Sequence, residues 1–588
     1  MTTGFVDVGR VFSDAQKVFA AGDFDAVLRL LVQLPASVAA DPNVQHLRAL
    51  AYKNTGRIDE AKVAFAAAER AAPRDPQIIN NHANLLMQTG APAAALPLYD
   101  RAIALQPDYK DARLNRALAL QALNRLPEAL AAIDELIGQG LTDARVHSAR
   151  GTILLAQERY DEAASAFDAS LASNQQLPKA LIGRARVALE RGETDAAARY
   201  RDALAAARGD ADVLLGLADA LEAEGDPAGL ALLADAVAAR PDWIGGLERV
   251  ARMRAETGDK DFTAHYLPAL GSVANQRPLQ LSLAKMLAGA DRHGEALAVL
   301  KDIDDDPALA ITRAFYNGEA GAPHEGLALL NGLDGPDAAL IEGRLALAIG
   351  ALDQAGAALD RAVALAPDSI AIWAHRELLW RAASDDRALW LSGQDGLVAQ
   401  YMIGLDAGDI AATAELLRGL HRTRAHPIGQ SLRGGTQTRG RLLLRPEPEI
   451  RRLRAALGDA VADHIRALPP ADPHHPLLRH RSAPFAIAGS WSVRLTSSGF
   501  HVAHIHPEGL LSSACYFALP AATKDAGRRD GWLEIGQAPP TLNLSLKPLA
   551  TIEPLPGRLA LFPSYLYHGT RPFADGERLT VAFDVIAP

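Results

Sequence analysis

The chain has 588 residues, a single cysteine and a formal net charge of −10. This length exceeds what one hydrophobic core organises, so we expect a multidomain protein, and the lone Cys515 excludes an intramolecular disulfide framework. The acidic balance argues against a nucleic-acid or anionic-membrane binder. No stretch reaches the about 18 uninterrupted apolar residues of a membrane span. Since the first residues also lack a secretory signal pattern, we expect a cytoplasmic protein.

The charge is unevenly distributed along the chain. Residues 421–588 contain 20 Lys and Arg and 13 Asp and Glu, a net charge of +7, which leaves −17 for residues 1–420. An acidic N-terminal region therefore precedes a basic C-terminal region. The basic region either handles an anionic small molecule and docks on the acidic region, or is simply solvated.

Turn residues recur with a period of 34 in the N-terminal region. They are Gly22, Gly56, Gly90, Asn124, Glu158 and Gly192. The register continues through Gly225, Gly258 and Arg292, and then becomes irregular, with turns expected at Gly321, Gly350 and Gly408. Small and large apolar residues at helical spacing flank the turns, as in paired amphipathic helices. A fixed period of this length predicts a solenoid of helix pairs.

These units resemble tetratricopeptide repeats, through the period and through the small and aromatic residues of NTGRIDEAKVAF and AQERYDEAASAF. The resemblance implies an all-α solenoid over residues 1–375, with a groove that binds a protein or peptide partner. An architectural or dimerising spacer is the alternative. We expect residues 376–420 to form an irregular helical connection.

The composition changes over residues 421–588, where Gly, Pro and alternating segments replace the Ala-rich helical text. RRLRAALGDAVADHIRAL has a helical period, whereas SWSVRLTS alternates apolar and polar residues as a half-buried strand does. Further strands are expected at HVAHIH, SSACYFAL, GWLEIG, ATIEPL, GRLALFP and RLTVAFDVI. Many short strands with Gly and Pro turns predict a mainly-β jelly roll or barrel with one packed helix.

Three histidines in this region have spacing suited to a mononuclear metal site. His504 and His506 lie two residues apart, so on a strand both imidazoles point to one face. His568 follows a second strand-like segment, which can return beside the first. Neutral imidazoles with room for exogenous ligands suit Fe(II).

An arginine and a threonine follow on the last expected strand. Arg578 and Thr580 are two residues apart and therefore share a face of that strand. A guanidinium inside a roll requires an anion, and its two parallel donors fit a carboxylate, to which the hydroxyl adds a hydrogen bond.

The combination resembles the 2-oxoglutarate/Fe(II)-dependent oxygenases, through HIHP, LFPSYLYHGT and RLTVAFDV. The resemblance implies a double-stranded β-helix in which His504, His506 and His568 hold Fe(II). It also implies that Arg578 and Thr580 bind the distal carboxylate of the cosubstrate 2-oxoglutarate. Tyr516 is a further candidate for cosubstrate contact.

One feature departs from the common pattern of that superfamily, which is His, any residue, then Asp or Glu. Here the second position is His506, which makes the site three-histidine. In a competing frame His506 and Glu508 supply the motif and His504 is not a ligand. A strand breaks at Pro507 and leaves Glu508 in a loop, which favours the three-histidine set.

The resemblance implies that the protein uses 2-oxoglutarate and dioxygen, with hydroxylation as the default outcome. Our leading hypothesis is a dioxygenase that hydroxylates a protein or peptide recruited by the repeats. One alternative is an interaction scaffold with a catalytically silent roll. The other is an oxygenase that acts on a small molecule, with the repeats serving assembly.

Overall fold

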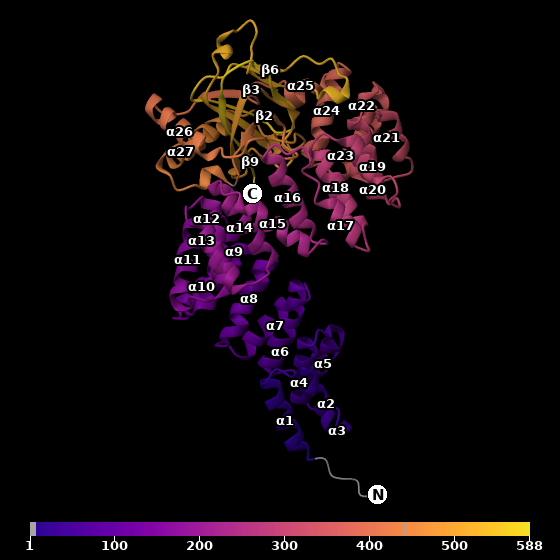
Figure 1. Ribbon diagram of the computed structural model, residues 1–588, viewed down its shortest axis with the longest axis vertical. Helices are drawn as coiled ribbons and strands as arrows, with labels where there is room; N and C mark the ends of the chain where they lie inside the picture. Colours follow the sequence, from indigo (N-terminus) through magenta and orange to yellow (C-terminus); the bar gives the residue numbers. More distant parts are fainter. Residues whose placement is uncertain (1–6, 440, 588) are drawn as a thin grey trace. The chain divides into compact units, whose positions relative to one another are not determined.

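A computed structural model describes residues 7–439 and 441–587. The chain forms two compact units, residues 1–187 and 188–588, and the division falls inside helix α12 (Pro178–Arg191). The helices and strands can be followed by label and colour in Figure 1. The described helices lack the combination of length and apolarity that a bilayer crossing demands.

The N-terminal unit consists of helices joined by short turns. They are α1 (Val8–Ala20), α2 (Phe24–Leu31), α3 (Ala36–Ala39), α4 (Pro42–Asn54), α5 (Ile58–Ala71), α6 (Pro76–Gln88), α7 (Pro92–Leu105), α8 (Lys110–Ala122), α9 (Leu126–Gly138), α10 (Ala144–Ala156), α11 (Tyr160–Ser173) and the first part of α12.

Left-handed turn residues join the two helices of each repeat in this unit. Gly22, Gly56, Gly90, Asn124 and Glu158 all have positive φ, between 58° and 84°. A left-handed residue just beyond a helix end lets the following N–H reach back to a free carbonyl of the last turn. Arg57 N–H, for example, donates to the Tyr52 carbonyl at 2.9 Å. The predicted period of 34 is therefore confirmed as a helix-turn-helix repeat.

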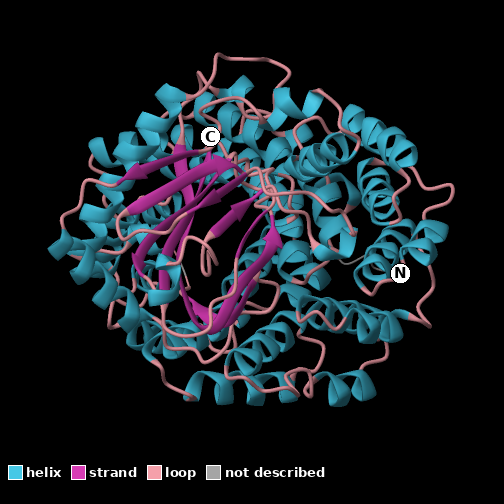
Figure 2. Ribbon diagram, turned by 90° about the horizontal axis from the view of Figure 1, so that it is seen from above, coloured by secondary structure: helices cyan, strands magenta, loops and turns pink. Residues whose placement is uncertain are grey.

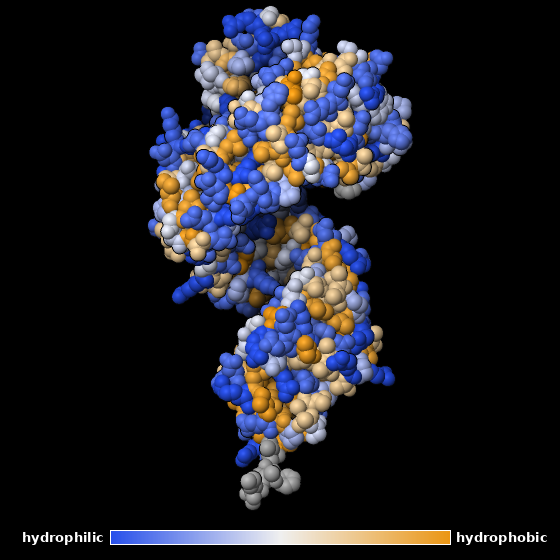
Figure 3. Space-filling model, turned by 90° about the vertical axis from the view of Figure 1, so that its right-hand side faces the viewer, coloured by the Kyte–Doolittle hydropathy of each residue, from blue (hydrophilic) through white to orange (hydrophobic). Residues whose placement is uncertain are grey.

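Close approach of neighbouring repeats depends on small residues. The Phe167 ring is fully buried and packs against Gly151 and Gly183, where an added Cβ would come within 2.8 Å and 2.2 Å of its atoms. On the face of the N-terminal helices drawn in Figure 3, apolar residues are interspersed with hydrophilic ones. Such scattered apolar residues are usual for a water-exposed surface.

The second unit contains the remaining helices, of which those before residue 393 continue the repeats and the last two belong to the C-terminal part of the unit. They are α13 (Ala196–Ala206), α14 (Ala211–Glu224), α15 (Ala228–Ala239), α16 (Ile244–Glu256), α17 (Tyr266–Ser272), α18 (Arg277–Gly289), α19 (His293–Leu300), α20 (Pro307–Glu319), α21 (Pro323–Leu329), α22 (Pro336–Ala348), α23 (Leu352–Leu365), α24 (Ile370–Ala382), α25 (Arg387–Ser392), α26 (Ala407–Leu420) and α27 (Pro448–Ala467).

Turns with positive φ continue through this unit, with two differences from the expected register. At the ninth position of the repeat register, which starts at Gly22, the left-handed residue is Asp291, with φ of 61°, rather than its neighbour Arg292. Gly408 lies inside α26 instead of at a turn, and the turn that follows Gly350 is at Ser384, 34 residues later. Helix pairs therefore continue to α25, past residue 375.

The strands form one antiparallel, half-barrel sheet, consistent with a jelly roll. They are β1 (Ala399–Met402), β2 (Leu432–Gln437), β3 (Ala486–His504), β4 (Leu511–Ala518), β5 (Leu533–Ile535), β6 (Ala550–Ile552), β7 (Arg558–Pro563), β8 (His568–Thr570) and β9 (Arg578–Ile586). Within the described residues the order is β1-β7-β4-β9-β3-β8-β5-β6, with β2 paired to β3. Figure 2 shows these strands gathered and curved.

Strand β3 is long because SWSVRLTS and HVAHIH, expected as two strands, are continuous. Its first part pairs with β9, and its last residues pair with β8, which was not expected as a separate strand. Between them Ser498 has φ of 65°, and a Cβ at Gly499 would lie 2.6 Å from the Thr496 carbonyl oxygen. This bend brings the end of β3 to β8.

The segment 376–420 does more than connect the repeats to the roll. It contains α25 and α26 and also strand β1, which pairs with β7. Side chains of α22 to α27 and of the sheet share one hydrophobic core, in which Leu347, Leu457 and Phe562 are fully buried. Within the second unit, helices and roll therefore form one packed body.

Ion pairs also hold the basic roll against acidic repeat helices. Arg439 pairs with Asp219 at 3.3 Å and Glu222 at 2.7 Å, both of α14, and with Glu256 at the end of α16. Arg249 shares the first two carboxylates. Burial raises the pKa of Glu256, and the Arg439 charge opposes this rise. The uneven sequence charge therefore corresponds to real contacts within this unit.

Arg439→Met is expected to destabilise the protein by about 2 kcal/mol, because it leaves the buried Glu256 carboxylate without its main counter-charge. The pKa of Glu256 then rises further, so the folded variant binds a proton that the unfolded chain, with a Glu pKa of about 4.3, releases. The variant therefore loses stability relative to the wild type as pH rises. Urea unfolding at pH 5 and pH 8 measures both effects.

Arg452→Met, which removes an exposed pair with Asp409, is the control. Equal losses of stability in the two variants would contradict the account.

Candidate functional site

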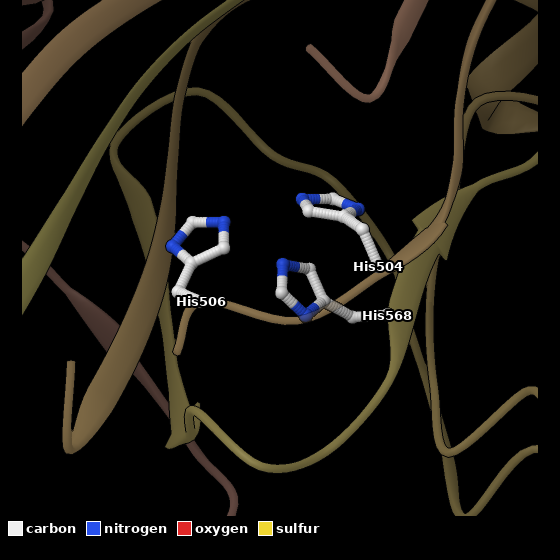
Figure 4. A group of neighbouring side chains, drawn as sticks. All are labelled: His504, His506 and His568. Atoms are coloured by element: carbon white, nitrogen blue, oxygen red, sulfur yellow. The ribbon is translucent and has the colours of Figure 1, made fainter. Parts of the chain in front are cut away.

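Three histidine side chains converge at the end of β3. His504 is the last residue of β3 and stands directly opposite His568, the first residue of β8. His506 lies two residues beyond the end of the strand, not on it as the alternation argument assumed. One ring nitrogen from each lies within 4.8 Å of the others. Figure 4 shows the three imidazoles around a common space, and the spacing of their nitrogens suits a single metal ion.

The Nδ1 atom of each imidazole already has a hydrogen-bond acceptor. His504 Nδ1 donates to the Val502 carbonyl at 2.8 Å, and His568 Nδ1 donates to the Leu566 carbonyl at 3.1 Å. His506 Nδ1 lies 2.5 Å from an Asp584 carboxylate oxygen. A carbonyl or carboxylate oxygen accepts the proton, so in a neutral ring Nε2 keeps its lone pair. This pattern is typical of metal-binding histidines.

Burial keeps two of these rings neutral. It lowers the pKa of His504 to about 3, with a smaller contribution from the neighbouring His506. It also lowers the pKa of His568 well below the ordinary value, with the neighbouring His504 as the next cause. Metal ligation needs the deprotonated nitrogen, and at neutral pH these two rings supply it.

Asp584 is a functional candidate that sequence reasoning missed. It lies on β9, and its carboxylate orients His506. The signal that pointed to it is a lone carboxylate in the otherwise apolar end of RLTVAFDVI. A carboxylate behind a ligating imidazole fixes its tautomer and raises its basicity.

Glu508, the alternative second ligand, lies outside the three-histidine group. Its side chain is exposed, although it lines the same cavity. His501 also lines the cavity, with Nδ1 3.0 Å from the Ser431 hydroxyl. Neither supplies an atom to the cluster formed by His504, His506 and His568.

Arg578 is a buried cation without a matching anion. Its side chain faces the cavity and the residue is 2% exposed. Nε donates to the Gly531 carbonyl at 3.1 Å, and no carboxylate among residues 7–439 and 441–587 forms a salt bridge with it. Burial lowers the pKa of this guanidinium. An unpaired buried charge is costly, so the site fits a bound anion.

The two accompanying candidates differ in position. Thr580 lines the cavity, and its hydroxyl makes a long 3.4 Å hydrogen bond to the Val493 carbonyl. Tyr516 lies opposite Thr580 in the β4–β9 register, and the Arg578 guanidinium lies 5.1 Å from its ring centre. Its hydroxyl is buried beside the Arg578 guanidinium, but the residue does not line the cavity.

The cavity over these groups has a volume of about 670 Å³ and walls from two parts of the second unit. The sheet contributes the three histidines, Arg578 and Thr580. Helices α18 to α20 and their turns contribute the other wall, through Lys285, Asp291, His293, Phe315, Tyr316 and Glu319. Asp291 pairs with Arg433 of β2 across the rim. The cavity therefore borders both the sheet and the repeat helices.

The C-terminal part of the chain matches a known family. Residues 489–584 match the family described as "Putative 2OG-Fe(II) oxygenase". Residues 42–75, 86–153 and 148–198 match tetratricopeptide-repeat families. Tetratricopeptide repeats in the N-terminal part therefore precede an oxygenase-family domain.

Several proteins named for tetratricopeptide repeats are similar to part of this chain. A tetratricopeptide repeat-containing thioredoxin, TTL4 of Arabidopsis thaliana, is 36% identical over 94 residues, which are 16% of this chain and 14% of that protein. A tetratricopeptide-repeat protein of Parabacteroides merdae has 18% identity and a TM-score of 0.33, covering 41% of this chain and 97% of its own. A thermophilic one of Thermus thermophilus has 24% identity and a TM-score of 0.28, with 31% and 99% covered.

Arg578→Met is expected to leave the ligand-free protein as stable as the wild type or more stable, because it removes an uncompensated buried charge. If Arg578 binds the anion, the variant is also expected to lose stabilisation by 2-oxoglutarate added with Co(II), since a ligand at 100 times its Kd that binds only the folded state stabilises it by about 2.7 kcal/mol. Thermal unfolding with and without ligand measures both. Arg571→Met, at a half-exposed neighbour, is the control. Retained ligand stabilisation in Arg578→Met would exclude this anion site.

Proposed function

We propose that this chain, in which tetratricopeptide repeats precede a 2-oxoglutarate/Fe(II) oxygenase domain, is a dioxygenase that hydroxylates a protein or peptide substrate. The repeats bring that substrate to the roll. Iron is held by three histidines, and 2-oxoglutarate is held by an arginine and a hydroxyl in the same cavity.

The proposed iron ligands are Nε2 of His504, His506 and His568. Each ring has Nδ1 in a hydrogen bond and Nε2 facing the common space, and imidazole nitrogens of this kind suit a divalent transition metal. When bound with 2-oxoglutarate, the iron supplies the activation of dioxygen that couples loss of CO₂ from 2-oxoglutarate to oxidation of a substrate. The protein supplies the orientation of the ligands and the exclusion of water.

The observation that carries the proposal is the buried, unpaired guanidinium in the cavity of the three imidazoles. Arg578 lines the same cavity as the three histidines, which supports assigning it one carboxylate of a dianion, with the other end at the metal. Thr580 adds a hydroxyl on the same face of β9. The Tyr516 ring packs against the Arg578 guanidinium. Tyr516 is a weaker candidate for contact with 2-oxoglutarate, because it does not line the cavity.

Two features support a protein or peptide substrate. Phe315, Tyr316 and Glu319 of the repeat helix α20 line the cavity, so the repeat region contributes to substrate selection at the site. The N-terminal unit carries further repeats, and solenoids of this kind offer extended binding surfaces.

A small-molecule substrate is the second candidate, since a cavity of about 670 Å³ lies within the range of small-ligand pockets. The scaffold alternative, with a catalytically silent roll, is disfavoured because it leaves the burial of Arg578 without an anion to offset it.

Purified protein with Fe(II) is expected to convert 2-oxoglutarate to succinate and CO₂. Mutation of a residue that only hydrogen-bonds to a metal ligand lowers metal affinity or activity by about 10–100-fold. Removal of a ligand itself, in His568→Ala, is therefore expected to lower the rate of succinate release at least about 100-fold. His474→Ala, at an exposed histidine, is the control. Succinate release is measured for each, with circular dichroism as the check on folding.

The outcomes separate the candidate functions. Unchanged succinate release in His568→Ala would overturn the metal assignment, and no release from folded wild type would favour the scaffold. A cell extract divided by dialysis tests the substrate class. Stimulation by the macromolecular fraction supports the proposal, whereas stimulation by the small-molecule fraction alone supports the second candidate.

A further inference from the structure

We propose that Tyr567 is a positioning residue for His568, and that helices α22 and α24 of the repeat region are part of the metal site. This inference rests on the proposed function, because it concerns the orientation of a proposed iron ligand. It makes the repeat region a component of the catalytic centre as well as a binding arm.

Tyr567 precedes His568 and turns its side chain toward the repeat helices. Its hydroxyl lies 3.3 Å from Nη1 of Arg344 on α22 and 3.4 Å from Nε2 of His375 on α24. The Tyr567 and His375 rings meet edge to face, with centroids 5.9 Å apart. All three residues are buried. The position of the hydroxyl is therefore set by two helices that are about 190 and 220 residues away in sequence.

The partners of Tyr567 are themselves held in place. His375 Nδ1 donates to the Ala371 carbonyl at 2.7 Å, so its Nε2 is an acceptor for both the tyrosine hydroxyl and Arg344. Arg344 also contacts Glu319 of α20 through Nε at 3.2 Å and through Nη2. Each member of this buried group has a partner, and a fully satisfied polar network is rigid.

A second route reaches the backbone of Tyr567. Its carbonyl accepts a hydrogen bond from Gly536 N–H at 2.6 Å, and the Gly536 carbonyl accepts from Nη1 of Arg381 on α24 at 2.6 Å. The preceding residue, Ile535 of β5, pairs directly with His568. The residue before His568 is therefore fixed to the repeat helices through its side chain and its backbone.

These contacts affect the proposed metal ligand through the short peptide segment that joins Tyr567 to His568. His568 Nδ1 bonds to the Leu566 carbonyl, so the peptide segment that sets the imidazole direction runs through Tyr567. A shift of that segment would turn Nε2 away from the other two nitrogens. Glu319, which contacts Arg344, also lines the cavity, so the same network reaches the cavity wall.

The test compares Co(II) binding by the full-length protein and its Tyr567→Phe variant, which loses only the hydroxyl. We expect about 10-fold weaker Co(II) affinity, the scale of outer-sphere effects on metal sites, together with a changed visible Co(II) spectrum. Tyr266→Phe is the matched control, because its buried hydroxyl bonds to Ser282 at 2.8 Å within the repeats. The control is expected to show a similar small fall in Tm with unchanged affinity and spectrum.

Wild-type affinity and spectrum in folded Tyr567→Phe would overturn the inference, as would equal Co(II) losses in both variants. If Tyr567→Phe does not fold, Arg344→Lys decides, since it keeps a cation beside Glu319 but cannot reach both Glu319 and the tyrosine. Wild-type Co(II) binding by that variant would also overturn the inference. Absence of Co(II) binding by the wild type contradicts the proposed function itself, so the two failures are distinguishable.

Discussion

The site depends on three hydrogen bonds that occupy Nδ1 of His504, His506 and His568. They leave the three Nε2 atoms facing a common space (Figure 4), and burial keeps the His504 and His568 rings neutral. The acceptors come from β3, β9 and the segment before β8, so the local geometry requires the bent β3 and the antiparallel pairing of the roll. His568 lies 62 residues after His506 in the sequence, and only the pairing of the strands brings the three histidines together.

Electrostatics explain the second half of the site. Arg578 is buried without an anion and lines the same cavity as the three histidines, so the guanidinium and a divalent metal held by the histidines would each attract one carboxylate of a dianion. The same principle operates at the repeat side of the second unit, where Arg439 compensates the buried Glu256. The difference is that Arg439 pairs with carboxylates of the chain, whereas no carboxylate of the described residues forms a salt bridge with Arg578. This difference is the reason for proposing Arg578, and not Arg439, as an anion-binding residue.

Much of this could be predicted from the sequence, because it depends on local rules. A helix C-terminus that needs positive φ selects Gly or Asn, so the turns at Gly22 and Asn124 were visible as a period. The position of His506 beyond the strand and the role of Asp584 were not visible, since both depend on where β3 ends beside β9. The contact between Arg344 and Tyr567 spans 223 residues and leaves no local pattern. The ligand roles of the three histidines, Arg578 and Thr580 remain predictions.

The most direct measurement is the X-ray absorption spectrum of the protein loaded anaerobically with Fe(II) and 2-oxoglutarate. Imidazole rings give a characteristic outer-shell scattering, so the number of histidine ligands can be counted. The account predicts three imidazoles, which fall to two in His504→Ala, and no change in Glu508→Gln. Two imidazoles in the wild type, with the spectrum altered by Glu508→Gln and unaffected by His504→Ala, would contradict the three-histidine centre.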